Sequence, residues 1–267
     1  MGAALAGFRA MELSPAEMLA RAKRFCGGSV KDATFPFLSL FAGRNGSRAA
    51  REIYDDWRVE DLPIGFFAVS TDLLRAEEVI HRRGPLWAAI RASASIPGAF
   101  PPMAIDGRCL VDGGVINNLP IDVMARLSPG RIAAVNTSKE IAFDLDAIEM
   151  LGELADGSTS GWRLLWRRLW PWRKREVRAL NIADVLARVS EVAAVRIARA
   201  TRAETPITLW IEPPTDGYRM LDFEAIDAIV EAGYRFAEGR VEEWKRELVS
   251  PTLRAPSPSE RPDKPSR

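Results

Sequence analysis

Short apolar runs and amphipathic stretches follow one another along the chain, and they predict strands and helices in alternation. An apolar run such as Ile64-Gly-Phe-Phe-Ala-Val-Ser70 is typical of a strand covered on both faces. Helix starts are indicated by proline at a first helical position and, at Ser14-Pro15-Ala16-Glu17, by a capping box. The small apolar residues of Met1–Arg9 indicate that the chain opens inside a helix. Strands are predicted at 64–70, 78–81, 103–111, 131–136 and 206–211, and helices at 14–25, 85–92, 120–127, 181–202 and 222–248.

This alternation favours an α/β fold with a mostly parallel sheet flanked by helices. The exception is 103–111, where Asp106-Gly107 predicts a hairpin turn. A chain of 267 residues suits one large domain, which we expect to cover residues 1–249. Residues 250–267 contain five prolines among polar and charged residues, and we expect them to form a disordered tail.

The segment 139–180 differs from the rest of the chain because it is rich in Trp and Arg. Trp162, Trp166 and Trp170 are spaced by four and would share one face of a helix, and Trp172 follows Pro171. Arginines lie off that face. The pattern suits a variable insertion or lid that contacts lipid or a membrane surface, and it suits a packed helix with a basic rim equally well. Nucleic acid is less favoured, since no other aromatic and basic groove is visible.

Composition and charge narrow the chemistry. Lys plus Arg is 37 and Asp plus Glu is 36, so a net charge of +1 gives no general attraction to nucleic acid or anionic membranes. The single histidine, His81, excludes a His-rich metal site. The two cysteines, Cys26 and Cys109, exclude a Cys-based zinc site and a disulfide scaffold. We therefore expect no metal and no cofactor. No apolar stretch reaches the roughly 18–20 residues that span a bilayer, so we expect a cytoplasmic protein, at most peripheral to the inner membrane face.

Asp112 is the candidate catalytic residue. It ends an apolar strand and enters the turn at Gly113 and Gly114. A carboxylate at the end of a parallel strand stands where α/β folds place their sites. From the residues alone, an aspartate that hydrogen-bonds its own turn is the more common explanation of such a pattern.

A longer stretch adds a family resemblance. Ser95-Ile-Pro-Gly-Ala-Phe-Pro-Pro102, then Asp112-Gly-Gly114 and Asn117-Asn-Leu-Pro120, resembles the patatin-like phospholipase family. The bacterial branch related to the neuropathy-target esterases is the most similar. Supporting stretches are Phe67–Asp72, His81–Trp87 and Glu212-Pro-Pro214.

The resemblance implies a three-layer α/β/α fold and a lipid acyl hydrolase that uses a Ser-Asp dyad. It carries the role of general base onto Asp112, and phospholipid, lysophospholipid and simple ester all remain open as the acyl substrate. A dyad needs no histidine, so His81 is interpreted as a structural residue at a strand end. Cys109 is interpreted as a core thiol. Ser93 and Ser95 are not expected to act as nucleophiles, because no Gly-x-Ser-x-Gly turn exposes them.

The sequence contains no Gly-x-Ser-x-Gly motif. Met1–Gly7 resembles the residues that follow the serine of the family's nucleophile elbow, so the resemblance places that serine immediately before Met1. The first sheet strand and the oxyanion loop would precede it. We therefore expect the 267-residue chain to be truncated and inactive. The alternatives are a pseudoenzyme that binds lipid or membranes and a non-functional fragment.

The lipid-facing interpretation of 139–180 predicts that the chain co-sediments with liposomes. Replacing Trp162, Trp166 and Trp170 together by Ala is expected to remove that binding, since buried aromatic rings supply much of the affinity of interfacial helices. The same replacement at Trp57, outside the segment, is the matched control. Absent binding, or binding that survives the triple replacement, contradicts a lipid-facing segment.

Overall fold

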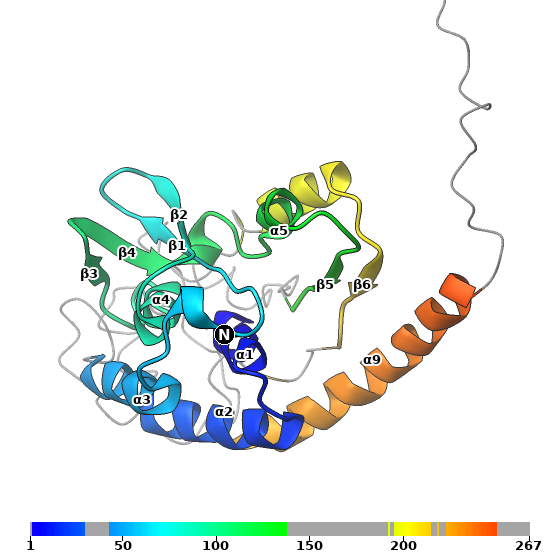
Figure 1. Ribbon diagram of the computed structural model, residues 1–267, viewed down its shortest axis with the longest axis horizontal. Helices are drawn as coiled ribbons and strands as arrows, with labels where there is room; N and C mark the ends of the chain where they lie inside the picture. The colour runs from blue at the N-terminus through cyan, green and yellow to red at the C-terminus, as the bar shows by residue number, and fades with distance from the viewer. Residues whose placement is uncertain are drawn as a thin grey trace, which may run out of the picture. The chain divides into compact units, whose positions relative to one another are not determined.

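The computed structural model describes residues 2–29, 43–137, 192, 195–214, 218 and 223–249. The chain divides into two compact units, one of Met1–Pro120 with Ser138–Thr201 and one of Ile121–Thr137 with Arg202–Arg267. The first unit contains α1 (Gly2–Ala10), α2 (Pro15–Ser29), α3 (Arg44–Tyr54), η1 (Val59–Asp61), β1 (Ala68–Asp72), β2 (Glu77–His81), α4 (Leu86–Ser93), β3 (Met103–Ile105), β4 (Arg108–Asp112) and η2 (Gly113–Val115) (Figure 1). The second contains α5 (Ile121–Leu127), β5 (Ala133–Val135), β6 (Leu209–Ile211), η3 (Phe223–Ala225) and α9 (Ile226–Val249).

The sheet of the first unit has four strands in the order β2-β1-β4-β3, and every pairing in it is antiparallel. This corrects the expectation of a mostly parallel sheet for the described strands, since only β5 and β6 pair in parallel. For the β1–β2 and β3–β4 pairs the physical reason is loop length. Parallel neighbours need a crossover of a dozen or more residues, whereas β1 and β2 are joined by four residues and β3 and β4 by two.

The mixed α/β class and most elements are as predicted. At the β3–β4 turn, Asp106 and Gly107 have φ of 50° and 69°, which is the geometry that an Asp-Gly hairpin turn requires. The capping box also forms, because the Ser14 N–H donates to Glu17 Oε2 at 2.9 Å and the Glu17 N–H donates to Ser14 Oγ at 3.4 Å. The strand predicted at 64–70 is displaced to Ala68–Asp72.

Helix α1 is fixed in the first unit by contacts with α2 and α4. Figure 1 shows α1 beside α4. Phe8 and Tyr54 stack with ring centroids 5.0 Å apart, and both side chains are buried. A Cβ at Gly7 would lie 2.7 Å from Ile90 Cδ1, so a glycine is needed where α1 approaches α4. The Tyr54 hydroxyl donates to the Ala4 carbonyl at 3.0 Å. These contacts set the position of the N-terminal end of α1.

Helix α4 joins the helices to the sheet, since it packs against α3 as well as against β1 and β4. Its buried residues are Leu86, Ala89, Ile90, Arg91 and Ala92. The presence of a buried arginine in this apolar set is unusual.

The predicted insertion at 139–180, including Trp162, Trp166, Trp170 and Trp172, lies outside the described residues, as does the tail at 250–267. Of the helix predicted at 181–202, the described part confirms helix at 195–202, and the observed helix continues to residue 204. Among the helices that the structure describes, none has both the length and the apolar character needed to cross a membrane.

Tyr54→Phe is expected to lower the free energy of unfolding by about 1 kcal/mol, the net value of a buried hydrogen bond. The change keeps the stacked ring and removes only the donor to Ala4. Tyr234→Phe in α9 is the matched control, because Tyr234 is 63% exposed and its hydroxyl bonds Glu238 at the surface. Urea denaturation of both variants measures the difference, and equal midpoints would contradict this role for the Tyr54 hydroxyl.

Candidate active site

Asp112 is the last residue of β4 and leads directly into η2. Its backbone N–H donates to the Ser95 carbonyl at 3.0 Å, and its own carbonyl accepts the Thr71 hydroxyl at 3.1 Å. Its Oδ1 accepts the Gly114 N–H at 2.6 Å. The residue therefore has its backbone held on both sides and one carboxylate oxygen held by the turn. The turn hydrogen bond expected of an Asp-Gly sequence is present.

Gly113 and Gly114, the two residues after Asp112, are each required for a different geometric reason. A Cβ at Gly113 would collide with the Val69 carbonyl, lying 2.8 Å from its carbon atom, so the backbone turns directly over β1. A Cβ at Gly114 would lie 2.9 Å from Asp112 Oδ1 and 2.9 Å from Asn118 Oδ1. Gly113 is thus needed for contact with the sheet, and Gly114 is needed to present its N–H to the carboxylate.

The pKa of Asp112 is raised above its usual range. Burial is the largest cause, because it disfavours the charged carboxylate. The positive charge of the chain's N-terminal amino group and the hydrogen bond from Gly114 both act in the opposite direction. The result is a carboxylate that holds a proton more readily than an ordinary aspartate.

His81 is engaged in a pair that the sequence interpretation missed. Its Nε2 lies 2.7 Å from the Ser70 hydroxyl, and burial followed by the charge of Arg108 lowers its pKa. Ser70 is fully buried and directly opposite Asp112 in the β1–β4 register. Paired residues point to the same face of a sheet, so Ser70 and Asp112 share a face. No alternation along Ala68–Asp72 marked the pair, because all five residues of β1 are buried and His81 comes close only when β1 pairs with β2.

The cysteine and serine interpretations can also be compared with the structure. Cys109 is half-buried, so its interpretation as a core thiol is wrong, whereas Cys26 is buried. Ser95 is fully buried, and its hydroxyl donates to the Arg91 carbonyl at 2.9 Å. Burial removes the Ser95 hydroxyl from contact with a substrate.

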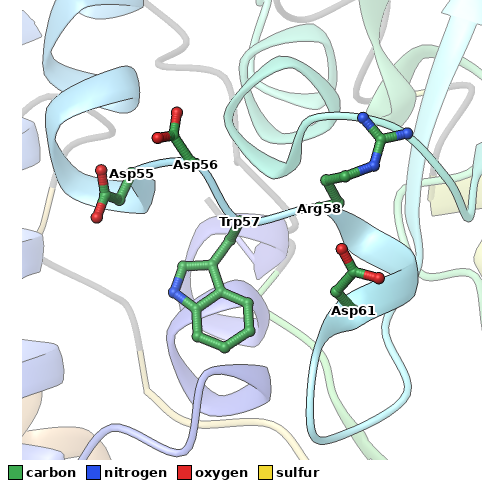
Figure 2. Close-up of a pocket in the computed structure, with 5 residues that line it drawn as sticks. All are labelled: Asp55, Asp56, Trp57, Arg58 and Asp61. Atoms are coloured by element: carbon green, nitrogen blue, oxygen red, sulfur yellow. The ribbon is translucent and has the colours of Figure 1, made fainter.

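A pocket of about 320 Å³ lies apart from these residues. It is lined by residues that follow α3, namely Asp55, Asp56, Trp57, Arg58 and Asp61. Figure 2 shows the Trp57 ring extending away from the Asp56 carboxylate and the Arg58 guanidinium. The pocket includes none of the predicted site residues. Across the described ranges, no group of three or more His, Cys, Asp or Glu is arranged to hold a metal ion.

Comparison with known proteins identifies the class to which this arrangement belongs. The family model described as Patatin-like phospholipase matches residues 1–125, a range that includes Ser95–Pro102 and Asp112–Gly114. The chain belongs to the patatin-like phospholipase family, which comprises lipid carboxylic ester hydrolases.

Three individual relatives show that the chain is similar to the neuropathy target esterases. The chain is 32% identical over 257 residues to Patatin-like phospholipase domain-containing protein 7 of Mus musculus, covering 93% of this chain and 18% of that protein. It is 32% identical over 219 residues to Patatin-like phospholipase domain-containing protein 6 of Homo sapiens, covering 81% and 15%. It is 32% identical over 213 residues to Neuropathy target esterase sws of Drosophila melanogaster, covering 79% and 14%. The chain thus spans less than a fifth of the length of these relatives. These three are animal proteins, so placement in a bacterial branch stays a prediction.

Asp112→Asn is expected to stabilise the protein increasingly as the pH rises above about 3.9, the ordinary value for Asp. Because the pKa of Asp112 is raised in the fold, the native state keeps a proton that the unfolded chain has lost. Stability of the parent protein therefore falls as the pH rises through that window. Asn keeps the oxygen that accepts the Gly114 N–H and carries no charge.

Melting temperatures of parent and variant between pH 3 and pH 8 measure this difference. The two proteins should differ least at the acid end, where the Asp112 carboxyl is protonated in both native and unfolded states. A difference in melting temperature that is constant across the pH range would show that ionisation of Asp112 does not destabilise the folded state.

Proposed function

We propose that this chain carries the general base of a serine lipid acyl hydrolase, with Asp112 as the aspartate of a Ser-Asp dyad. The serine of the proposed dyad immediately precedes Met1. The observation that carries the proposal is the place of Asp112 at the end of β4, where its backbone is held by Ser95 and Thr71 and its Oδ1 accepts the Gly114 N–H. Burial raises the pKa of this carboxyl, which favours the uptake of a proton.

The helix that begins at Gly2 supports the same assignment. In a nucleophile elbow, the serine stands on a sharp turn between a strand and a helix. Helix α1 begins at Gly2 and is held against the rest of the unit through Phe8 and Tyr54. A serine just before this helix would be presented from a fixed element, as efficient catalysis requires.

In the proposed mechanism, Asp112 accepts the proton of the serine hydroxyl while the oxygen attacks the ester carbonyl carbon. Oδ1 is engaged by the Gly114 N–H, so Oδ2 is the oxygen available for the proton. The proton then passes to the departing alcohol, leaving an acyl-enzyme. Water, deprotonated by Asp112, attacks the acyl group, and the fatty acid is released as the serine oxygen takes that proton from Asp112. A raised pKa suits this role, because a general base works best when its pKa lies near the operating pH.

The substrate of the proposed enzyme is a lipid acyl ester, and the reaction needs no cofactor. For the 267-residue chain by itself we propose little or no turnover, since no Gly-x-Ser-x-Gly motif is present in it. We place the protein in the cytoplasm, at most peripheral to the membrane. The alternative is a lipid-binding chain without catalysis, which the Trp/Arg pattern at 139–180 favours.

The gene provides the first test of the dyad. The DNA upstream of Met1 is expected to encode, in frame, a Gly-x-Ser that ends directly before Met1. In the longer protein, Asp112→Asn should lower ester hydrolysis by about 10²–10⁴-fold, the usual contribution of a general base. Asp106→Asn is the matched control, because Asp106 is exposed in a turn at φ 50°, a geometry that asparagine tolerates.

An in-frame stop codon immediately before Met1 would refute the proposed position of the serine. Hydrolysis that Asp112→Asn leaves unchanged would remove Asp112 from the mechanism. A loss that is equally large in Asp106→Asn would point to general disruption of the β3–β4 hairpin.

A further inference from the structure

Arg91, in the last turn of α4, is only 3% exposed although it carries a charge. Its Nη1 donates to the Ser95 hydroxyl at 2.6 Å, and its Nη2 donates to the Pro101 carbonyl at 3.4 Å. The guanidinium carbon lies 5.4 Å from the centroid of the Phe100 ring. One side chain therefore holds both ends of the segment between α4 and β3, and its burial is supported by specific contacts.

The space around the guanidinium is shaped by a residue from another part of the unit. Gly43 precedes α3 and has φ 74°, and a Cβ there would lie 2.7 Å from Arg91 Nη2 and 2.8 Å from Pro101 Cγ. The backbone angle and the lack of space both require glycine at this position. Gly43 and Pro101 therefore lie close against the guanidinium of Arg91 and leave a narrow space that fits this planar group.

Ser95 connects Arg91 to Asp112. Its hydroxyl accepts from Arg91 Nη1 and donates to the Arg91 backbone carbonyl, so the two residues are tied in both directions. The Ser95 carbonyl then accepts the N–H of Asp112 at 3.0 Å. Two hydrogen bonds, connected through the covalent structure of Ser95, therefore link the Arg91 guanidinium to the backbone of the candidate general base.

We propose that Arg91 is a positioning residue for Asp112. By holding Ser95 and Pro101 it fixes the Ser95 carbonyl, which in turn holds the N–H of Asp112 and sets the direction of the carboxylate. An arginine suits this task better than a lysine, because its planar fork donates to two acceptors in fixed directions. The catalytic meaning of the inference rests on the proposed function, whereas the link between Arg91 and Asp112 is measurable without turnover.

The test measures amide hydrogen exchange and the carboxyl titration of Asp112 by NMR in the 267-residue chain. Arg91→Lys keeps the charge but cannot reach both acceptors. It is expected to speed exchange of the Asp112 amide by about tenfold, the value of one net hydrogen bond. The Leu73 amide, which donates to Cys109 of the same strand, should exchange as in the parent. The titration midpoint of Asp112 should fall, because a loosened turn admits water.

Arg51→Lys is the matched control, since Arg51 is exposed on α3 over the Trp87 ring and lies outside this network. Ser95→Ala is the second variant, which removes the hydroxyl link while keeping the carbonyl that Asp112 uses. Ser95→Ala should also speed hydrogen exchange of the Asp112 amide. It serves as the test of the proposal if Arg91→Lys does not fold. Unchanged Asp112 exchange in the folded variant, or equal acceleration at Leu73, would overturn the role of Arg91.

In the longer protein that contains the serine, Arg91→Lys should lower kcat with little change in KM and move the acid limb of the pH profile to lower pH. The two proposals fail in different ways. A parent protein without hydrolysis refutes the proposed function while the exchange data still judge the link between Arg91 and Asp112. An active parent with an unchanged Arg91→Lys profile refutes the positioning role alone.

Discussion

The close contact between the Gly113 backbone and the Val69 carbonyl determines where the candidate carboxylate lies. Any side chain at Gly113 would collide with β1. Because residue 113 is glycine, the chain can cross over β1 immediately after Asp112. The N–H of Gly114 then points back at Asp112 Oδ1. The requirement for glycine at position 113 thus sets both the position of the Asp112 carboxylate and its only described side-chain hydrogen bond. The antiparallel pairing of β1 with β4 supplies the second half of the same constraint, because it aligns Ser70 with Asp112.

A second set of contacts fixes the other proposed partner of the reaction. Gly7 permits close approach of α1 to α4, and the Tyr54 hydroxyl holds a carbonyl near the start of α1. Helix α4 also packs on β1 and β4. The start of α1 and the end of β4 are therefore positioned through one shared helix. A fixed distance between them is what a nucleophile and its base need, since small misplacements of reacting groups cost large factors in rate.

Local signals in the sequence predicted local structure well. Proline and capping residues marked the start of α2, and Asp106-Gly107 marked the hairpin, because each acts within a few residues. For the described strands the mostly parallel sheet was wrong, because short loops make β1–β2 and β3–β4 antiparallel and the β1–β4 pairing joins strands far apart in the chain. The Ser70–His81 pair was missed because it forms only when β1 pairs with β2, and the importance of Arg91 was missed because its burial follows from the packing of α4. Asp112 was singled out by its turn and by family resemblance, and its pKa could only follow from burial in the fold.

Two aspartates of one sheet, Asp72 and Asp112, have pKa values shifted in opposite directions. Asp72 is fully buried, and burial opposes its ionisation, yet its pKa is lowered because Arg75, the Leu74 N–H and the Cys109 N–H all bond the carboxylate. Asp112 receives one backbone N–H, and burial raises its pKa. A carboxylate whose bonds are satisfied stabilises a turn, whereas one left underbonded in a buried place retains affinity for a proton. This asymmetry between neighbouring strands is the arrangement expected if Asp112 is kept for proton transfer.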